Sequence, residues 1–598
     1  MRELLYSFLY DSREKVLRTT RFFTVLCALA ALSLFLYEYG FPITEEIETK
    51  IHKWINLFFL FFATQYFIRL LYSFERADFI KHTWLEGGMM TFILITGVLK
   101  YGFHINWIDD FFHLFHFKHH KQVMRVIISV STLYFAGFEF IKLSEYLNRL
   151  TIQPAATFIF SFLFLISLGC GMLMLPEMTV SGVGASFSDA FFTSVSASCV
   201  TGLVVVDTAT YFTHKGHLVI MLLMQLGGIG IVSFAMFFTT FTKSSFGIKH
   251  QAIIQDFLST DSLHSAKGLL RQVILITVLI ELMAATLLFF SWGDKIAFVS
   301  FQEKVFFSVF HGISAFCNAG FSLFSDGLYQ DVVRHSYILH VIIGMTIIIG
   351  SLGFSTIQDL FSPRLLRERM DKPWKDWKLG TKISVFTSIG LILTGMLLFA
   401  LTEWNNSLVG LTKFEKVVTM FFQSVTTRTA GFNTVDFSTL MVPTLIFMIF
   451  LMFIGASSGS TGGGIKTSTF LLILKSSIAA IRGQREVDLG KRRISNELLF
   501  KALSIFVFAA TYNLIMIFLL SISDGDKPII NLVFEQVSAF GTVGLSTGIT
   551  ASLSMFGKWI IIISMFFGRI GTLTLALALS SRIKCNSYSY PDAHIMIG

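Results

Sequence analysis

The sequence is poor in charge, proline and cysteine. Charged residues make up 14% of its 598 residues, and 8 prolines and 5 cysteines stand against 67 phenylalanines. Hydrophobic residues, by contrast, make up 54% of the chain. A water-soluble protein cannot bury that much apolar surface, so the composition excludes the soluble classes and indicates a polytopic membrane protein.

Several chemical motifs are also missing. The cysteines are scattered, without the spacing of a disulfide framework or a metal site. HExxH, GxSxG and paired carboxylates are absent from the apolar runs, so an intramembrane enzyme is not expected. The first apolar run, Phe22 to Tyr39, leads into "YGFPITEE" rather than a small-residue cleavage site, and we interpret it as a membrane helix rather than a signal peptide.

Basic residues are concentrated in particular loops. The segments Arg364 to Lys382 and Lys475 to Lys501 carry seven Lys or Arg each, whereas Leu323 to Ser336 is nearly free of them. Because cytoplasmic loops carry an excess of Lys and Arg, the first two loops are expected inside and the third outside. The pattern predicts a multi-pass protein of the cell membrane with both termini in the cytoplasm.

One pattern occurs four times along the chain. It consists of a short aromatic-rich run, a small or polar pair, a glycine and a bulky apolar residue, as in "FFTSVSASCVTGL" and "AFGTVGL". Each copy lies between two apolar runs that are long enough to span a membrane. The short run would make a helix of about 18 Å, whereas the bilayer core is about 30 Å thick, so it must enter and return on one side. The four glycines are Gly202, Gly320, Gly431 and Gly544, at intervals of 118, 111 and 113 residues.

Four re-entrant loops in one chain predict a shared pore. Non-helical backbone at membrane depth is tolerated only where it is buried in protein or lines a water-filled cavity. Each short helix would direct the negative end of its dipole into the pore, and the carbonyls after it would replace the hydration shell of a cation. The fold class is therefore an all-α polytopic membrane protein with four tandem helix–pore-loop–helix repeats around a pseudo-fourfold pore. The alternative, a solute transporter whose glycine-rich breaks bind substrate at the midplane, is less favoured because the loops match in every repeat.

Longer motifs resemble a known family. From about Gln153 to Gly598 the chain is similar to the Trk/Ktr/HKT superfamily of potassium transporters, and specifically to the membrane-spanning subunit of bacterial Ktr and Trk systems. The similarity rests on "TTRTAGFNTVD", "SAFGTVGLSTG", "GSTGGGIKT" and the ending "YPDAHIMIG". The resemblance implies a potassium-binding filter made of Val200, Thr201, Gly202, Asn318, Ala319, Gly320, Thr429, Ala430, Gly431, Thr542, Val543 and Gly544.

The same resemblance implies selectivity and partners. In this family glycine in all four loops accompanies potassium preference, while serine in the first accompanies sodium, so potassium is the expected ion and a sodium-conducting or sodium-coupled transporter is the alternative. A homodimer on a cytoplasmic ring of nucleotide-binding regulatory subunits is implied, with membrane lipids around it. No GxGxxG follows a predicted strand, so nucleotide control would come from that other chain. No cofactor beyond the transported K⁺ and no nucleic acid is expected.

The chain departs from the family at its front. Residues 1–150 add about four apolar runs, near Phe22 to Tyr39, Trp54 to Leu71, Trp84 to Tyr101 and Val123 to Phe140. A voltage sensor is disfavoured because it needs a ladder of arginines in one span, and Arg125 stands alone near the fourth. The histidines from His113 to His120 could hold zinc, although an interfacial helix is the commoner explanation. The predicted domains are 1–150, then pore repeats at 151–245, 246–360, 361–480 and 481–598, the last with the C-terminal tail.

Some charges lie where charges are costly. Arg569 falls inside the last apolar run, where a charge usually faces a cavity and a partner. Arg428 precedes the third filter segment and Glu535 lies in the fourth short run, and we consider that they pair behind the filter. Three aspartates follow their filter glycines and either form an acidic vestibule or suit the turns there. They are Asp207, Asp326 and Asp436.

The stretch "GASSGSTGGG" interrupts the second apolar run of the third repeat. Each glycine costs a helix about 1 kcal/mol relative to alanine, so the helix is predicted to open into a loop that obstructs the pore. Arg569 is expected to hold this loop closed. A packing kink is the alternative, and it suits the shorter glycine pairs of the other repeats better. The predicted gating residues are Gly455, Ser457, Ser458, Gly459, Ser460, Thr461, Gly462, Gly463, Gly464 and Arg569.

Overall fold

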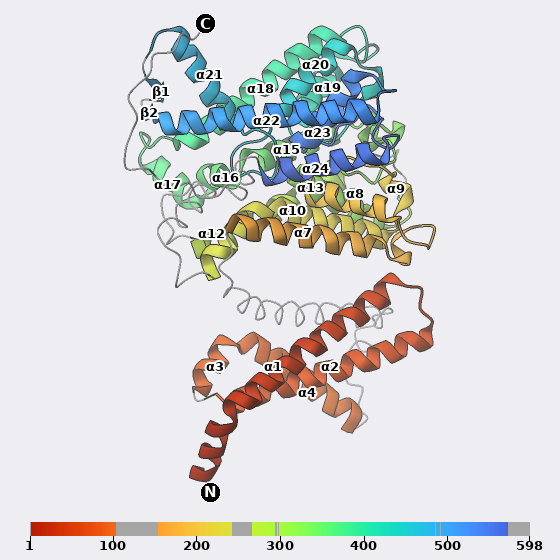
Figure 1. Ribbon diagram of the computed structural model, residues 1–598, viewed down its shortest axis with the longest axis vertical. Helices are drawn as coiled ribbons and strands as arrows, with labels where there is room; N and C mark the ends of the chain where they lie inside the picture. The colour runs from red at the N-terminus through yellow and green to blue at the C-terminus, as the bar shows by residue number, and fades with distance from the viewer. Residues whose placement is uncertain are drawn as a thin grey trace. The chain divides into compact units, whose positions relative to one another are not determined.

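A computed structural model describes most of the chain (Figure 1). The described residues are 2–73, 75–102, 154–241, 266–293, 296, 298–484, 486–490 and 492–571. The predicted span from Val123 to Phe140, Arg125, the histidines from His113 to His120 and the C-terminal tail lie outside them. The chain divides into two compact units, one of residues 1–151 with Leu175–Glu177 and one of the remaining residues.

The first unit contains three long helices and a short one. They are α1 (Arg2–Gly40), α2 (Glu45–Leu71), α3 (Arg76–His82) and α4 (Trp84–Gly102). Ile55, Phe59, Ala63 and Tyr66 recur every three or four residues along α2 and therefore share one helix face. This face is buried against residues of α1 and α4, including Ala28 and Met90. Three of the four apolar runs predicted in residues 1–150 are thus helical, and two of them, in α1 and α2, are long and apolar enough to cross a membrane.

The second unit repeats one motif four times. In each copy a short helix lies between two helices that continue the chain on either side, as predicted. The first repeat has α7 (Pro154–Leu173), α8 (Phe187–Ser198) and α10 (His214–Phe241), and the second has α12 (Ala266–Ser291), α13 (Phe301–Cys317) and α15 (Tyr337–Leu352). The third has α18 (Leu379–Glu403), α19 (Lys413–Thr426) and α20 (Val442–Phe453), and the fourth has α22 (Asn496–Ser523), α23 (Ile529–Gly541) and α24 (Met555–Ile570).

Shorter elements connect these helices. The loops after the short helices contain α9 (Thr208–Tyr211), η3 (Gly327–Tyr329), α14 (Asp331–Arg334) and η4 (Phe437–Thr439), and η1 (Pro176–Met178) precedes α8. α16 (Phe354–Phe361) precedes the first basic loop, and α17 (Pro363–Asp371) overlaps it. α21 (Thr467–Ile481) leads into the second basic loop, which contains an antiparallel hairpin of β1 (Val487–Leu489) and β2 (Arg492–Ile494), with Val487 opposite Ile494.

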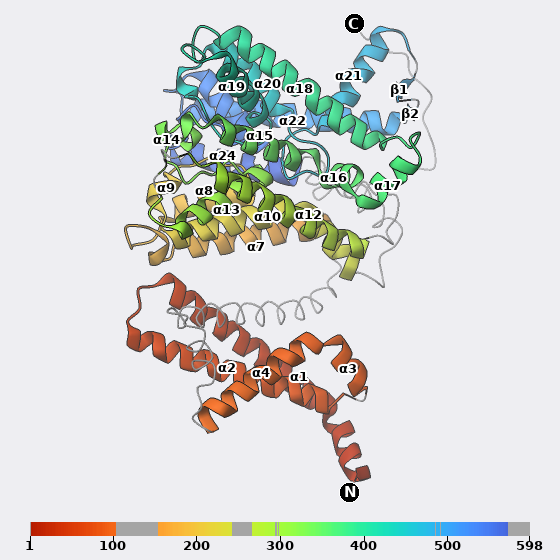
Figure 2. The ribbon, with the colours of Figure 1, turned by 180° about the vertical axis from the view of Figure 1, so that it is seen from behind.

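Neighbouring repeats share their hydrophobic cores. Phe192 of α8 packs in one cluster with Ile561 of α24, which joins the first repeat to the fourth. Ile343 of α15 and Phe422 of α19 join the second repeat to the third. Residues of α20 and α23 join the third to the fourth, and Figure 2 shows α10 beside α12 and α13, which joins the first to the second. The repeats therefore follow one another around a closed circle.

Five described helices are long and apolar enough to cross a membrane. They are the part of α1 from Tyr10 to Gly40, α2, the part of α12 from Arg271 to Ser291, α18 and α22. A sixth span results if α15 and α16 are counted together, although the chain bends by 104° between them. The helices α20, α21 and α23 are apolar but shorter. The sequence-based prediction of a polytopic membrane protein is confirmed.

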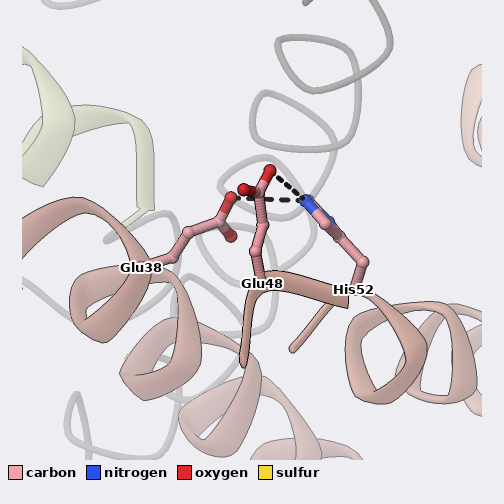
Figure 3. A group of neighbouring side chains, drawn as sticks. All are labelled: Glu38, Glu48 and His52. Carbon is pink, nitrogen blue, oxygen red and sulfur yellow. Dashed lines mark ion pairs between the residues drawn. The ribbon is translucent and has the colours of Figure 1, made fainter. Parts of the chain in front are cut away.

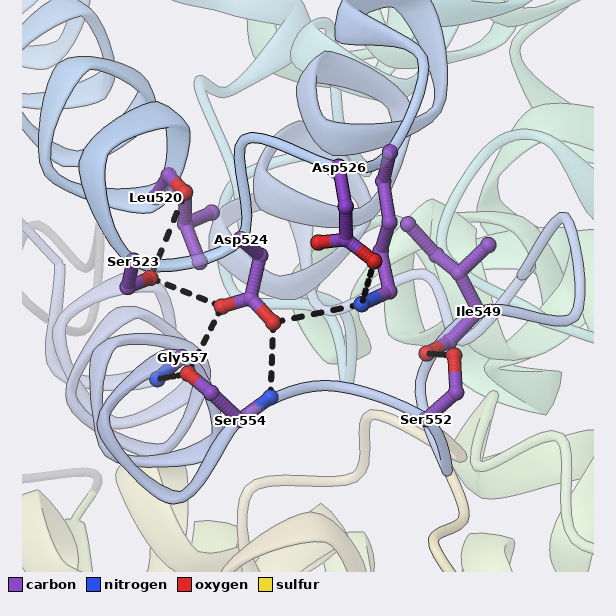
Figure 4. A network of polar contacts seen from close by, with 9 residues as sticks. Leu520, Ser523, Asp524, Asp526, Ile549, Ser552, Ser554 and Gly557 are labelled. Carbon is purple, nitrogen blue, oxygen red and sulfur yellow. Dashed lines mark hydrogen bonds and ion pairs between the residues drawn. The ribbon is translucent and has the colours of Figure 1, made fainter.

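A buried carboxylate connects two helices of the fourth repeat, α22 and α24 (Figure 4). Asp524 ends α22, and its side chain is 2% exposed. It accepts hydrogen bonds from the backbone and hydroxyl of Ser554 at 2.7 and 2.8 Å and from the hydroxyl of Ser523 at 2.7 Å. The ammonium of Lys527 lies 3.3 Å away. The start of α24 is therefore anchored to the end of α22.

We expect Asp524→Asn to lower the free energy of unfolding by about 1–3 kcal/mol. Both carboxylate oxygens of Asp524 accept hydrogen bonds, whereas the amide nitrogen of asparagine cannot accept one. Burial alone would raise the pKa of Asp524, but the hydrogen bonds from Ser554, Ser523 and Lys527 outweigh it and hold the pKa below its ordinary 3.8. The stabilisation is therefore complete above pH 3.8 and declines as the pH falls below it. Thermal midpoints of the detergent-solubilised protein at several pH values measure this effect.

Asp526→Asn is the matched control, because Asp526 also faces Lys527 but is 78% exposed. It should leave the midpoint unchanged. Equal midpoints for the two variants at neutral pH would contradict the anchoring role of Asp524.

Candidate functional site

All four short helices end in the same strained turn. A residue with a left-handed backbone follows each helix: Val200 (φ 58°), Asn318 (φ 60°), Thr429 (φ 71°) and Thr542 (φ 48°). No other non-glycine residue in the described part of the chain has a positive φ. This conformation costs an L-amino acid about 1–2 kcal/mol. Strain repeated at one place in four repeats marks a functional site.

The four repeat glycines pack into a closed ring. All have positive φ, between 69° and 92°. Each lies against the carbonyl of the residue before the glycine of the next repeat, so closely that an added Cβ would collide with it. The gap from that Cβ to the carbonyl oxygen would be 2.4 Å for Gly202 and Ala319, 2.8 Å for Gly320 and Ala430, 2.3 Å for Gly431 and Val543, and 2.0 Å for Gly544 and Thr201. The fourth contact returns to the first repeat and completes the ring.

The ring is electronegative. It presents backbone carbonyls, and the C-termini of α8, α13, α19 and α23 lie next to it, each with a partial negative charge of about 0.5. Such an arrangement suits a cation that has lost its water. Eight of the twelve residues predicted for the filter make the contacts of this ring. The other four, Val200, Asn318, Thr429 and Thr542, are the left-handed residues two positions before each glycine.

Sequence reasoning missed the hydroxyls that hold the ring. Ser196 bonds both the carbonyl of Leu203 at 2.7 Å and the backbone of Gly202 at 3.1 Å. Ser314 bonds the carbonyl of Phe321 at 2.8 Å, and Ser538 accepts from the backbone of Gly544 at 3.1 Å. These three serines stand six residues before their glycines, a repeated signal that the sequence contains. In the third repeat Thr426, five residues before, bonds the carbonyl of Phe432 at 2.7 Å.

The predicted pairing of Arg428 with Glu535 is wrong. Arg428 donates instead to the carbonyl and hydroxyl of Ser388 on α18, at 3.3 and 3.1 Å. The segment after Gly544 folds back over Glu535, which accepts from the backbone of Thr547 at 3.1 Å, from Thr550 at 2.8 Å and from Ser546. Each residue therefore braces its own repeat, because polar groups of that repeat bond it in place of the opposite charge.

The glycine-rich stretch is a loop, as predicted. α20 ends at Phe453 and α21 begins at Thr467. Two of the loop's hydrogen bonds reach the second repeat: Ser457 bonds Ser351, at the end of α15, and Gly459 bonds Phe354, at the start of α16. Others are local and join Gly455 to Ile465, Ser458 to Ser468, and Ser460 to Ser457. Three further residues of the loop contact the ring region. Gly463 donates to the hydroxyl of Thr542 at 2.9 Å, Thr461 donates to the carbonyl of Phe316 at 3.3 Å, and Gly462 lies against the hydroxyl of Thr429.

Two cations, the buried Arg569 and the half-buried Lys466, bind the loop. Arg569 is 1% exposed and donates to the carbonyls of Thr461, Gly227 and Gly228, the last at 3.2 Å. It therefore links the loop to α24 and α10. Lys466, which the sequence analysis missed, donates to the carbonyl of Gly462 at 2.6 Å. The sequence does contain a signal for Lys466, because it is a charged residue at the end of "GGGIK", inside a stretch expected at membrane depth.

The glycine pairs of the other repeats allow close packing, in agreement with the kink alternative. A Cβ at Gly227, Gly350 or Gly568 would lie about 2 Å from a carbonyl of the short helix of the same repeat. These carbonyls belong to Ser198, Phe316 and Phe540, each four residues before its ring glycine. In the third repeat Gly455 meets the carbonyl of Gly463 instead. In the third repeat, the loop therefore replaces the contact that the other repeats make between the corresponding glycine and the short helix.

The three aspartates behave as turn residues in two cases. Asp207 caps α9 by accepting from the backbone of Ala209 at 3.1 Å, and Asp436 caps η4 by accepting from Ser438 at 2.9 Å. Asp326 precedes η3 without a side-chain cap. The turn interpretation is confirmed for Asp207 and Asp436, and an acidic vestibule stays a prediction.

Four helix–loop–helix repeats around one ring of carbonyls define a class of membrane transport protein, and comparison with known proteins identifies the family. The family described as "TrkH: Cation transport protein" matches residues 165–589. The Ktr system potassium uptake protein B of Bacillus subtilis is 37% identical over 447 residues, covering 74% of this chain and 97% of that protein. The potassium/sodium uptake protein NtpJ of Enterococcus hirae is 32% identical over 460 residues, covering 75% and 98%. The chain belongs to the TrkH family of cation transport proteins.

A solved structure has the same fold. The crystal structure of the potassium transporter TrkH from Vibrio parahaemolyticus matches with a TM-score of 0.58 at 18% identity, over 76% of this chain and 91% of that one. The residues before 165 lie outside the family match.

Proposed function

We propose that this protein takes up potassium ions across the cytoplasmic membrane, with the four-glycine ring as its selectivity filter. The observation that carries the proposal is the closed cycle of contacts from Gly202 through Gly320 and Gly431 to Gly544 and back. It gathers carbonyls of four loops around one point, the arrangement that replaces an ion's hydration shell. Two relatives that are at least 32% identical over most of their length are named as potassium uptake proteins, which supports the choice of ion.

The loop Gly455–Gly464 is proposed as the gate. It lies against ring residues of the third and fourth repeats and against the short helix of the second, so in this position it narrows the route away from the ring. Arg569 and Lys466 hold it there through carbonyl hydrogen bonds. Transport would follow a population shift to a conformation in which these bonds are broken.

A regulatory partner is part of the proposal. The relative from Bacillus subtilis is named as protein B of a Ktr system, which supports a second component here as well. A homodimer with cytoplasmic termini, on a nucleotide-binding ring, would let that partner act on the two basic loops, which include α17 and the end of α21. Lipids would surround the assembly.

A sodium-conducting or sodium-coupled transporter is the second candidate. It is supported by the relative whose name includes both ions, potassium and sodium. The glycine at each of the four ring positions favours potassium instead.

Growth of a potassium-transporter-deficient bacterium in potassium-limited medium tests the proposal. We expect the gene to restore growth, alone or with a candidate regulatory subunit, because the ring would admit potassium. Rubidium-86 uptake with and without excess sodium separates the two ions. No rescue with any partner, despite protein in the membrane fraction, would remove the proposed function.

A further inference from the structure

A cluster of two carboxylates and an imidazole lies in the N-terminal unit, outside the family match. Glu38 lies in the last turn of α1, and Glu48 and His52 lie one turn apart near the start of α2 (Figure 3). One ligand atom from each of the three residues lies within 4.8 Å of the other two. The two helices meet here through the short turn after Gly40, so the cluster is at the end of a helical hairpin.

The distances in the cluster are those between ligands of a metal ion. The Nε2 atom of His52 lies 3.4 Å from a carboxylate oxygen of Glu38 and 3.6 Å from one of Glu48. Both exceed the about 2.7–3.2 Å of an ordinary N–H···O hydrogen bond. Zinc bonds of about 2.0–2.2 Å to nitrogen and oxygen put tetrahedral ligands about 3.3–3.6 Å apart. The imidazole of His52 is therefore as far from each carboxylate as two ligands of one small cation are from each other.

Burial adds a second argument. The Glu38 side chain is 6% exposed, and those of His52 and Glu48 are 24% and 23% exposed. Two carboxylates held close together in a partly buried site repel one another, and a cation bound between them would offset that repulsion. The other ring nitrogen of His52, Nδ1, is buried without a hydrogen-bond partner among the described residues.

We propose that Glu38, Glu48 and His52 bind a divalent transition-metal ion of the zinc type. An imidazole with two carboxylates suits such an ion better than calcium or magnesium, which prefer sites made of oxygen alone. Water would complete the tetrahedron. The bound ion joins α1 to α2 and stabilises the N-terminal hairpin.

Zinc binding by the full-length protein in detergent tests the proposal. After removal of metal with a chelator and dialysis against Zn²⁺, the wild type is expected to hold one zinc more per chain than His52→Gln or Glu38→Gln. Zinc should raise the thermal midpoint of the wild type and have a smaller effect on the variants, since binding to the folded state stabilises it. The zinc content of each variant is compared with that of the wild type, rather than read as an absolute number, because the histidines from His113 to His120 could bind further zinc.

Glu46→Gln is the matched control. Glu46 lies in the first turn of α2, is 79% exposed and pairs with Lys50. The variant therefore removes one carboxylate charge, as Glu38→Gln does, without changing a residue of the cluster. It should bind zinc as the wild type does. Replacing zinc with Co²⁺ adds a direct signature, the strong visible absorption of a tetrahedral cobalt site, in the wild type and the control alone. Equal zinc content and equal midpoint shifts in all four proteins would leave the cluster as an ion pair and overturn the proposal.

Discussion

Replacing Arg569 with alanine is expected to raise potassium flux about tenfold or more in the absence of any regulatory partner. The substitution removes the donors that hold the carbonyls of Thr461, Gly227 and Gly228. Hydrogen bonds to a charged group are worth about 1.5–3 kcal/mol, and each 1.4 kcal/mol shifts a two-state equilibrium about tenfold. Rubidium-86 uptake into proteoliposomes measures the flux, and competition with sodium should show unchanged selectivity.

Two further variants sharpen this test. Lys475→Ala removes an exposed cation from α21, beyond the loop, and should leave the flux unchanged. Deletion of Ser457 to Gly462 should also raise the flux, because the deletion removes the proposed gate whereas Arg569→Ala removes the side chain that holds it. Wild-type flux in a well-folded Arg569→Ala protein would mean that the gate lies elsewhere.

Gly202→Ser is expected to lower the preference for potassium over sodium by about tenfold or more. A Cβ at this position would lie 2.4 Å from the carbonyl oxygen of Ala319, and its φ of 88° disfavours any side chain. The carbonyl must therefore move, and a change of 1.4 kcal/mol in relative ion binding is a factor of about ten. Competition of sodium with rubidium-86 uptake measures the preference.

Gly390→Ser controls for the added side chain. Gly390 lies within α18, and a Cβ there would meet nothing within 4 Å. This variant should keep the wild-type preference. An unchanged preference in Gly202→Ser would be evidence against the first loop as part of the filter.

The sequence predicted the repeated architecture well because its signals are local. Length, hydrophobicity and backbone propensity are enough to recognise the four matching glycines, the short apolar runs and the glycine-rich interruption. The loops and the break after Phe453 accordingly lie where they were expected. The order in which repeats touch could not be read in the same way, since it depends on packing between segments more than 100 residues apart.

Side-chain partners were harder to predict. Arg428 and Glu535 looked complementary, yet Ser388 lies beside the first and the hydroxyls of Ser546 and Thr550 lie beside the second. Charge in a sequence indicates that a partner is needed without saying which one. Neutral hydroxyls and carbonyls compete for that role, and a sequence contains far more of them than of opposite charges.

The two cations on the proposed gate also act through their charge. The partners described for Arg569 and Lys466 are carbonyl oxygens, which solvate a positive charge without cancelling it. At about 10 Å and an effective dielectric constant of about 20, each charge opposes a monovalent cation by about 2 kcal/mol. A closed gate is then an electrostatic barrier as well as an obstruction. Under the proposed gating, withdrawal of the loop would take Lys466 along, whereas Arg569 would stay on α24, so opening would lift only part of the repulsion that an incoming ion meets.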